Sequence, residues 1–338
     1  MGWDIGGVNT KVARVVGGGA AVIATAARAF ELQRAPDRLV GVLRELAAEV
    51  GAGPGEVHGV TMTAELSQLF RSKGEGVAFV LDALRAAFPD ATLRVYSTAG
   101  EWLEPGAALA RPLAVAAANW SATARLVARD HPDAILIDIG TTTTDIIPIV
   151  GGVVAALGAT DLDRLRHGEL VYTGAVRTPV ESLAQALPWP DGTAIGLAAE
   201  WFATAGDVHL WRGELPPEVY AVPTADGRPA TREHAAERLA RAVCADRSML
   251  DDAAIDRLAA ALAEAQERRV AQAVGRVRRR HPGLGTAVVA GVGDFIAERA
   301  ARRVGLTVVR MREMLGSRAS SIAPAVAVAC LLHASGDA

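Results

Sequence analysis

Cysteine is nearly absent from this sequence, and histidine is scattered through it. The two cysteines, Cys244 and Cys330, lie in unrelated segments without a CxxC pattern, so neither a disulfide framework nor a thiolate zinc cage is expected. The seven histidines show no HxH or HxxxH spacing, and each is interpreted as a surface or core residue rather than a metal ligand. These absences argue against zinc enzymes and disulfide-stabilised domains.

The chain also lacks a long apolar run and an excess of charge of one sign. The longest late apolar run, residues 323–332, contains Pro324 and is well short of the ~20 residues that span a bilayer. The start of the chain runs directly into residues 3–7, Trp-Asp-Ile-Gly-Gly, without the features of a signal peptide. The 35 basic and 38 acidic residues give a net charge of −3, so no global field favours nucleic acid or a membrane. We expect a cytoplasmic protein whose partners are small molecules or further copies of the chain, with no nucleic acid and no membrane.

The sequence does contain enough apolar material for more than one core. Hydrophobic residues make up 51% of the 338 residues, and at ~150 residues per domain this length predicts about two domains. Apolar spacing predicts helices at 38–50, 76–88 and 114–129, with strands at 59–63 and 93–96 between them. This alternation is typical of a layered α/β domain.

One short pattern occurs twice in the chain. Residues 4–13 and residues 138–147 both read D-I-G-x-x-x-T-x-apolar-apolar, and the second copy follows the first after 138 − 4 = 134 residues, about one domain. The β-branched runs 134–137 and 146–150 flank the second copy and favour strands. Each copy is therefore predicted to form a strand, a polar turn and a second strand.

The chemistry of these turns points to phosphate. Glycine lets backbone N–H groups approach an anion closely, and Thr or Asn side chains add donors. An aspartate cannot bind phosphate directly, but Asp4 and Asp138 can hold Mg²⁺ or orient an attacking group. One such turn alone is equally well explained as an ordinary hairpin, whereas two copies favour a phosphate site. The candidate phosphate-binding residues are Gly6, Gly7, Asn9, Thr10, Lys11, Gly140, Thr141, Thr142 and Thr143.

A third glycine-rich element lies late in the chain. The apolar run 287–290 leads into Gly291, Gly293 and Asp294, and a helical pattern follows at 296–303. A helix N-terminus after a glycine turn can bind an anion or a nucleotide. The segment lacks the third glycine of the dinucleotide fingerprint, which disfavours a Rossmann dehydrogenase.

The remaining segments are less specific. Residues 171–215 are rich in proline and tryptophan and suit either a cap over a substrate site or a structural subdomain. Residues 232–280 have a helical pattern with a break near 251–252, and the basic run 276–280 at its end is explained by the helix macrodipole. An alanine-rich helix is predicted to close the chain at 322–332.

The two turns and the late glycine-rich element resemble those of the acetate and sugar kinase, Hsc70 and actin superfamily. The segments 62–66 (Met-Thr-Ala-Glu-Leu), 118–120 (Ala-Asn-Trp), 138–145 and 168–174 (Gly-Glu-Leu-Val-Tyr-Thr-Gly) resemble its hydantoinase/oxoprolinase-related branch. More narrowly, they are similar to tetrahydromethanopterin-linked C1-pathway proteins. The resemblance implies a two-lobed actin-like ATPase (ribonuclease H-like) α/β fold, with duplicated domains and a central phosphate-binding cleft. The expected lobes are residues 1–132 and 133–338, with an irregular insert at about 171–230 and a closing helix that packs back on the first lobe.

The resemblance also implies an activity in methanofuran or methylofuran biosynthesis. We expect a transferase that joins an (aminomethyl)furan-methyl diphosphate to the phenol oxygen of a tyramine- or tyrosine-derived acceptor and releases diphosphate, with Mg²⁺ to neutralise charge. The expected catalytic residues are Asp4, Asp138, Asp145, Lys73 and Glu65. Lys73 is equally well explained as a solvated loop lysine, and Glu65 as a partner of the substrate amine or a structural residue.

Two other interpretations stay open. One is an ATP-dependent kinase or amide hydrolase, in which Gly291, Gly293 and Asp294 hold the adenosine and ribose of ATP. The other is a nucleotide-gated scaffold, which ranks last because the chain lacks the additional domains of such proteins.

Overall fold

The computed structural model describes residues 1–16, 21–53 and 55–336. They form two compact units, of which the first combines Met1–Leu136, Ile147–His167 and Arg310–Ala338, and the second combines Ile137–Ile146 and Gly168–Val309. Each unit is therefore assembled from more than one segment of the chain, and the first unit joins segments from both of its ends. Among the described residues, no helix combines the length and the apolar character that crossing a membrane requires.

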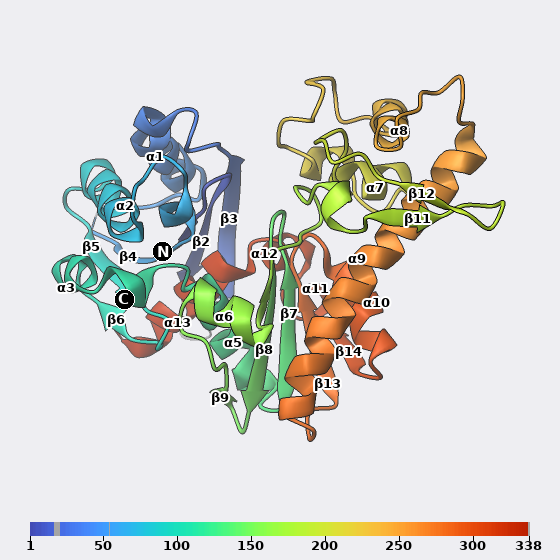
Figure 1. The fold of residues 1–338 in the computed structure, drawn as a ribbon. Coiled ribbons are helices and arrows are strands. Elements are labelled where there is room, and N and C mark those ends of the chain that lie inside the picture. Colours follow the sequence, from blue (N-terminus) through green and yellow to red (C-terminus); the bar gives the residue numbers. More distant parts are fainter. Residues whose placement is uncertain (17–20, 54, 337–338) are drawn as a thin grey trace. The chain divides into compact units, whose positions relative to one another are not determined.

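The first unit is built on a six-stranded sheet with the strand order β3-β2-β1-β4-β5-β6 (Figure 1). Strand β1 is antiparallel to β2 and parallel to β4, so the first copy of the repeated pattern forms the hairpin that the sequence predicts. The strands are β1 (Gly2–Ile5), β2 (Asn9–Val16), β3 (Ala21–Ala29), β4 (Val57–Met62), β5 (Thr92–Tyr96) and β6 (Trp102–Leu103).

Two of the predicted helices begin at other residues than the apolar spacing suggested. Helix α2 (Lys73–Ala87) begins three residues before the predicted 76, because the Ser72 side chain accepts the Glu75 N–H at 3.2 Å and caps it. Helix α5 (Asn119–Asp130) begins after the predicted 114, because Ala117 adopts a left-handed conformation with φ of 51°. The prediction of one helix from 114 was wrong: a short helix α4 (Pro112–Val115) comes first.

Helix α1 (Leu39–Glu49) matches its prediction closely and buries one apolar face. The short helical segments of the first unit are η1 (Pro36–Arg38), η2 (Ala64–Leu66), α3 (Pro105–Ala110), α6 (Asp161–His167), α11 (Met311–Leu315) and α12 (Ser317–Ser320).

The closing helix α13 (Ala323–Ser335) packs against β1, β2 and α5 of the first unit. Its packing on β1 is very close: a Cβ atom added to Gly2 would lie 2.3 Å from both the Ala325 carbonyl oxygen and the Ala329 nitrogen. Only glycine on the strand and small residues on the helix permit this approach. The alanine-rich composition therefore reflects helix packing in the middle of a core.

The second sheet contains the second copy of the pattern. Its strand order is β10-β8-β7-β13-β14, and β9 also pairs with β8. In both sheets the first strand of the repeated hairpin also has a later strand on its other side, β4 in the first sheet and β13 in the second, as expected for duplicated domains. The strands are β7 (Ala134–Ile139), β8 (Thr144–Val150), β9 (Val153–Val154), β10 (Leu170–Val171), β13 (Thr286–Ala290) and β14 (Thr307–Arg310).

The proline- and tryptophan-rich segment folds as a packed subdomain of the second unit (Figure 1). Its Val180, Leu187, Val208 and Trp211 share one apolar core with residues of the two following helices, which favours the structural interpretation of these side chains. Besides its sheet, the second unit contains η3 (Val180–Ser182), β11 (Ala186–Pro188), β12 (Ala194–Gly196), α7 (Ala205–Trp211), η4 (Pro217–Val219), α8 (Arg232–Arg241), α9 (Asp252–Arg280) and α10 (Asp294–Arg303).

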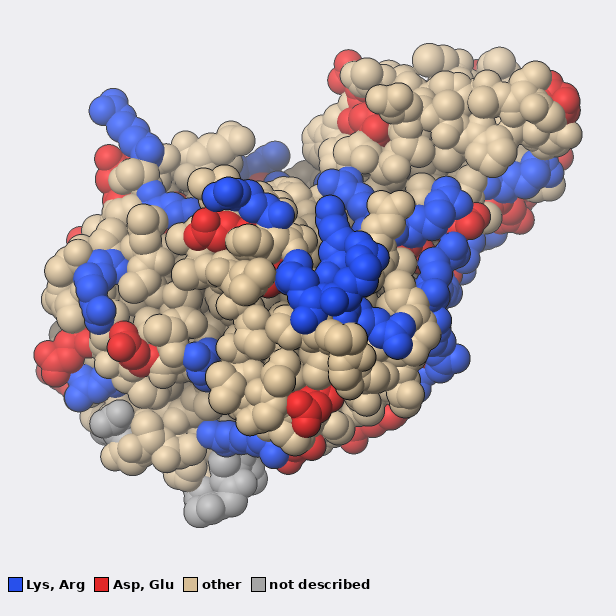
Figure 2. Space-filling model, turned by 60° about the horizontal axis from the view of Figure 1, so that its bottom comes forward, with Lys and Arg blue, Asp and Glu red and all other residues tan. Residues whose placement is uncertain are grey.

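The predicted break and basic run in 232–280 both have local causes. Helix α8 ends at Arg241, and Asp251 caps α9 by accepting the Ala254 N–H at 2.8 Å. In the basic run, Arg280 pairs with Glu169 at 2.8 Å and Arg278 donates to the Val304 carbonyl. Figure 2 shows Lys and Arg side chains gathered on one face of the molecule, with fewer Asp and Glu side chains around them. The contacts of Arg278 and Arg280 lie within the protein, and basic residues at a helix C-terminus also suit the helix macrodipole.

Candidate active site

The two repeated turns have the same hydrogen bond at equivalent positions. The Gly6 N–H donates to the Asn9 carbonyl at 2.9 Å, and the Gly140 N–H donates to the Thr143 carbonyl at 2.9 Å. Each pair is offset by the same 134 residues (140 − 6 and 143 − 9). The sequence repeat is therefore also a repeat of backbone geometry.

In the first turn, a neighbouring segment fixes the direction of the peptide groups. The carbonyl oxygens of Gly7 and Val8 accept N–H groups of Leu32 at 3.0 Å and Phe30 at 2.9 Å. In a trans peptide the N–H points away from the C=O of the same peptide group. The N–H groups of Val8 and Asn9 therefore point away from that segment, as a backbone cradle for an anion requires.

The second turn is held in the same way by residues that follow the Gly-Glu-Leu-Val-Tyr-Thr-Gly segment. Ala175 donates its N–H to the Gly140 carbonyl at 2.9 Å, and Arg177 donates to the Thr141 carbonyl at 2.9 Å. By the same stereochemistry, the N–H groups of Thr141 and Thr142 point away from these supporting residues. Both turns thus present amide donors on the side opposite their supports.

Asp4 lies at the start of the first turn and is almost fully buried. One carboxylate oxygen, Oδ2, accepts the Lys11 ammonium at 3.0 Å, so Lys11 neutralises Asp4 in addition to any contact with phosphate. The other oxygen, Oδ1, is buried and has no hydrogen-bond partner among the described residues. Burying such an oxygen without a partner is costly, and a bound cation would satisfy it.

Asp138 lies at the start of the second turn, against the third glycine-rich element. A Cβ atom on Gly291 would come within 2.4 Å of Asp138 Oδ1 and within 2.3 Å of the Ile139 carbonyl oxygen. Gly293 donates its N–H to that same carbonyl at 2.9 Å, and Asp294 is the first residue of α10. The structure therefore brings Asp138 together with the residues predicted for nucleotide binding.

Asp145 is the remaining aspartate of the predicted set. It is buried in β8 and lies opposite Leu170 of β10, so it is part of the sheet and not of the turn. Thr10 is buried as well, and it lies opposite Ile5 in the first hairpin.

The Met-Thr-Ala-Glu-Leu segment lies beside the first turn. Ile5 and Met62 end parallel neighbouring strands, and Thr63 donates its N–H to the Ile5 carbonyl at 2.9 Å. A Cβ atom on Gly6 would lie 3.3 Å from the Thr63 hydroxyl oxygen. The segment therefore extends from the carboxyl edge of the sheet, where α/β proteins place their ligands.

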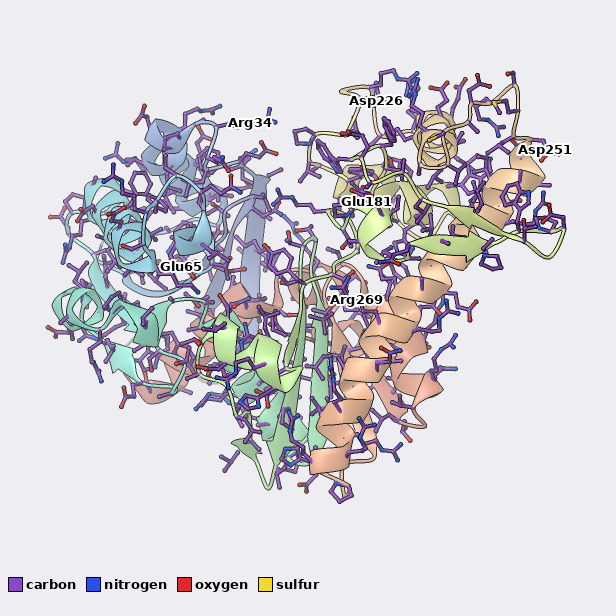
Figure 3. All side chains as sticks on the ribbon, in the orientation of Figure 1. Arg34, Glu65, Glu181, Asp226, Asp251 and Arg269 are labelled. Carbon is purple, nitrogen blue, oxygen red and sulfur yellow. The ribbon has the colours of Figure 1, made fainter. Side chains whose placement is uncertain are left out.

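Glu65, within this segment, is labelled in Figure 3. It is a buried carboxyl group with only 1% of its surface exposed. Burial raises its pKa to about 7, although the nearby Lys73 opposes the shift. Lys73 Nζ lies 3.4 Å from Glu65 Oε1 and 2.6 Å from Asp161 Oδ2. Glu65 Oε2 is buried without a hydrogen-bond partner among the described residues. The sequence predicted Glu65 and Lys73 separately, and the structure joins them.

Two further charged residues, Asp161 and Arg164, complete this cluster, and sequence reasoning did not select them. Arg164 is buried, donates to Asp161 Oδ1 at 2.9 Å, and lies 4.7 Å above the centre of the Trp120 ring. Although burial opposes it, the bonds and charges of Lys73 and Arg164 lower the pKa of Asp161. Asp161 and Arg164 are three residues apart on a helix. Oppositely charged pairs at this spacing are common on exposed helix surfaces, so the sequence gives no sign that this pair is buried.

The described residues contain no group of three or more His, Cys, Asp or Glu side chains that could hold a metal ion. A Mg²⁺ ion that is bound by one or two carboxylates keeps several waters and takes phosphate oxygens as its other ligands. The buried, unpartnered Oδ1 of Asp4 fits that mode of binding.

Comparison with known proteins gives a family and two curated relatives. The family model described as hydantoinase/oxoprolinase matches residues 56–335. The "(4-{4-[2-(gamma-L-glutamylamino)ethyl]phenoxymethyl}furan-2-yl)methanamine synthase" of Methanocaldococcus jannaschii is 34% identical over 98% of this chain and 97% of its own. The protein of the same name from Methanococcus vannielii is 31% identical over 59% of this chain and 90% of its own.

Among solved structures, the nucleotide-free structure of acetone carboxylase matches with a TM-score of 0.50. That protein is described as carrying out ATP-dependent acetone carboxylation. The two share 14% identity, and the match covers 89% of this chain and 46% of that one. At this identity the likeness concerns the fold alone.

Proposed function

The chain belongs to the hydantoinase/oxoprolinase family and has its actin-like α/β fold, and on this premise we propose the reaction that it catalyses. Its curated relatives are synthases named for a product in which a phenoxy oxygen is bonded to the methylene carbon of a furan. We propose that this enzyme forms that bond in the same product or a close analogue, in methanofuran-type cofactor biosynthesis. The identity of 34% over nearly the full chain is the observation that carries the proposal.

The proposed reaction is a transfer with diphosphate as the leaving group. The bond between the furan methylene carbon and the diphosphate oxygen breaks, and a bond from the same carbon to the phenol oxygen forms. The phenol proton passes to a base, and diphosphate leaves with the bonding electrons. The carbon can share positive charge with the furan ring, so stabilising the leaving group lowers the barrier.

Each repeated turn by itself supplies the chemistry expected for binding a phosphate group. We assign phosphate binding to the N–H groups of each turn, which point away from its own supporting segment. We assign Mg²⁺ to Asp4, whose Oδ1 is buried without a partner. When bound, the ion would neutralise charge on the leaving diphosphate.

Glu65 is the proposed acceptor of the phenol proton. An efficient base has a pKa near the working pH, and burial raises the pKa of this carboxyl to about 7. Its Oε2 has no partner among the described residues, and it follows the strand edge next to the first turn.

The test is a reconstituted reaction with two substrates. The enzyme is incubated with Mg²⁺, an (aminomethyl)furan-methyl diphosphate and gamma-glutamyltyramine, and diphosphate release and the ether product are measured. We expect release to require both substrates. Glu65→Gln should lower kcat at least 100-fold while leaving the affinity for diphosphate unchanged, and Glu313→Gln, an exposed site, is the control.

Two outcomes would contradict the proposal. Diphosphate release from the furan substrate without a phenol would exclude the transfer. Turnover that requires ATP, with phosphate or ADP as product, would instead favour a kinase or amide hydrolase that uses the glycine-rich element at Gly291 and Gly293.

A further inference from the structure

A buried chain of hydrogen bonds runs from Thr173 and Gly174, beside the second turn, to α9 and α7. Gln266 of α9 donates from Nε2 to the Thr173 hydroxyl at 2.9 Å and to the Gly174 carbonyl at 2.8 Å. Its Oε1 lies 2.8 Å from His209 Nε2, and His209 Nδ1 lies 2.9 Å from Glu214 Oε2. The side chains of His209 and Gln266 are fully buried.

The contacts of Gln266 fix which way its amide group points. The Nε2 atom has two hydrogens, and its two acceptors use both of them. Turning the amide over would place Oε1 within 2.8 Å of the Gly174 carbonyl oxygen, and two acceptors repel each other at that distance. Oε1 therefore faces His209 and can only accept.

The contacts of Glu214 fix the other side of the ring. Its Oε1 accepts Arg212 at 2.9 Å and Arg299 at 2.7 Å. Two guanidinium groups on the same oxygen stabilise the ionised form of the Glu214 carboxyl group over its neutral form. Glu214 is thus a carboxylate, and its Oε2 also can only accept.

We infer that His209 is a buried imidazolium cation that positions the second turn through Gln266. Both ring nitrogens face atoms that only accept, so both must carry a proton. The ring also stands edge to face with Phe295 of α10, with centroids 4.9 Å apart. The charges nearest the ring are Glu214, its two arginines Arg212 and Arg299, and Glu267, which pairs with Arg299 at 3.1 Å.

The far end of the chain of hydrogen bonds supports the second turn directly. A Cβ atom on Gly174 would lie 2.5 Å from the Thr142 nitrogen, so this residue is pressed against the turn. The next residue, Ala175, and then Val176 and Arg177 donate to the carbonyl groups that orient the turn. Fixing Gly174 and Thr173 therefore fixes the amide donors of the turn. The bond from a charged His209 to Gln266 is charge-assisted, and such a bond holds Gln266 more strongly than a neutral one.

His209 is thus a positioning residue, because it contacts Gln266 and Glu214 and not the turn. Phosphate binding by the turn rests on the proposed function. The charge on His209 and its effect on the position of the turn do not depend on that function. The proposal is therefore tested first without any substrate.

The experiment compares wild type with Gln266→Leu, and with Gln272→Leu as a matched control on the same helix, where Gln272 is exposed. Long-range proton–nitrogen NMR of the wild type at neutral pH should give two protonated imidazole nitrogens for His209. Hydrogen exchange of the amides of Ala175, Val176 and Arg177 should become at least tenfold faster in Gln266→Leu and stay unchanged in Gln272→Leu. If Gln266→Leu does not fold, Gln266→Glu keeps the acceptor for His209 and loses both donors, with Gln272→Glu as control.

Binding of inorganic diphosphate with Mg²⁺ is then measured by calorimetry. We expect at least a tenfold weaker affinity in the Gln266 variant than in its control. A neutral His209 ring, or unchanged exchange in the Gln266 variant, would overturn the inference. If wild type does not bind diphosphate, the proposed function fails, while the spectra and the exchange rates still decide on His209.

Discussion

At the scale of single residues, the neighbouring charges decide whether a buried acidic side chain keeps its proton. Glu65, Asp161 and Glu214 are all acidic, yet burial raises the pKa of Glu65 to about 7 while basic neighbours lower the pKa of the other two. The difference follows from the number of cations within hydrogen-bond distance: Glu65 has Lys73 at 3.4 Å, whereas Asp161 has both Lys73 and Arg164. The sequence contains the carboxylates but not these distances.

Glu65 should make the stability of the protein depend on pH. Its pKa is raised from the model-peptide value of 4.5 to about 7 on folding, so its stabilising contribution is complete below pH 4.5 and is lost as the pH rises through 7. Between pH 5 and pH 8 the ionisation of Glu65 should lower the free energy of unfolding of wild type by about 2 kcal/mol. The Glu65→Gln variant should not show this part of the decrease. Urea unfolding at both pH values measures this, with Glu313→Gln as control. Parallel pH dependence in wild type and Glu65→Gln would show that Glu65 is not the titrating group.

Gly291 should be the least replaceable glycine near the second turn. Its φ is +84°, and a Cβ atom would lie 2.3 Å from the Ile139 carbonyl oxygen. Alanine at this position would therefore have a strained backbone conformation and a steric clash. We expect Gly291→Ala to lower the free energy of unfolding by at least about 2 kcal/mol. Gly283→Ala is the control, since nothing lies within 4 Å of a Cβ there. Equal urea midpoints for the two variants would contradict this account.

At the scale of elements, local chemistry sets where helices begin. Ser72 and Asp251 cap α2 and α9 with side-chain oxygens, and the start of α9 was predictable because two aspartates follow a break in apolar spacing. The start of α5 was not, because the left-handed Ala117 beside Met62 depends on the neighbouring strand, whose Met62 carbonyl accepts the Ala117 N–H at 3.0 Å.

Asp251 lies at the start of α9 (Figure 3), and Asp251→Ala should weaken the first turn of this helix. The lost bond to the Ala254 N–H should cost about 1 kcal/mol of unfolding free energy, and Asp251→Ser should restore most of it because serine also caps. Thermal unfolding followed by circular dichroism measures both. A serine variant no more stable than the alanine variant would mean that the cap contributes little.

At the scale of the whole molecule, the first unit needs both ends of the chain. Strand β1 pairs with β2 and β4, and α13, more than 300 residues later in the sequence, packs directly on it. The family resemblance led us to expect a closing helix on the first lobe. The apolar pattern of α13 does not indicate which elements it packs against, because nearly all of its faces are buried.

Ending the chain after Val309 should therefore unfold the first unit. The truncation removes α13 and leaves Gly2, Ala13 and Gly59 without the helix that covers them. Limited proteolysis with mass spectrometry should find rapid cleavage in residues 21–53 of the truncated protein, whereas a chain ending after Ser335 should stay protected. Equal protection in both chains would show that α13 does not hold the unit together.

The sequence by itself determined the two hairpin turns, the α/β class and the family-like segments, because these depend on residues close together in the chain. A glycine turn needs its own glycines, and hydrogen bonds from Gly6 to Asn9 and from Gly140 to Thr143 span three residues. Only the tertiary structure decided which polar side chains meet. The contacts of Lys73 with Asp161 and of Gln266 with Thr173 join residues about 90 apart, and no local pattern encodes a distance set by the packing of separate elements.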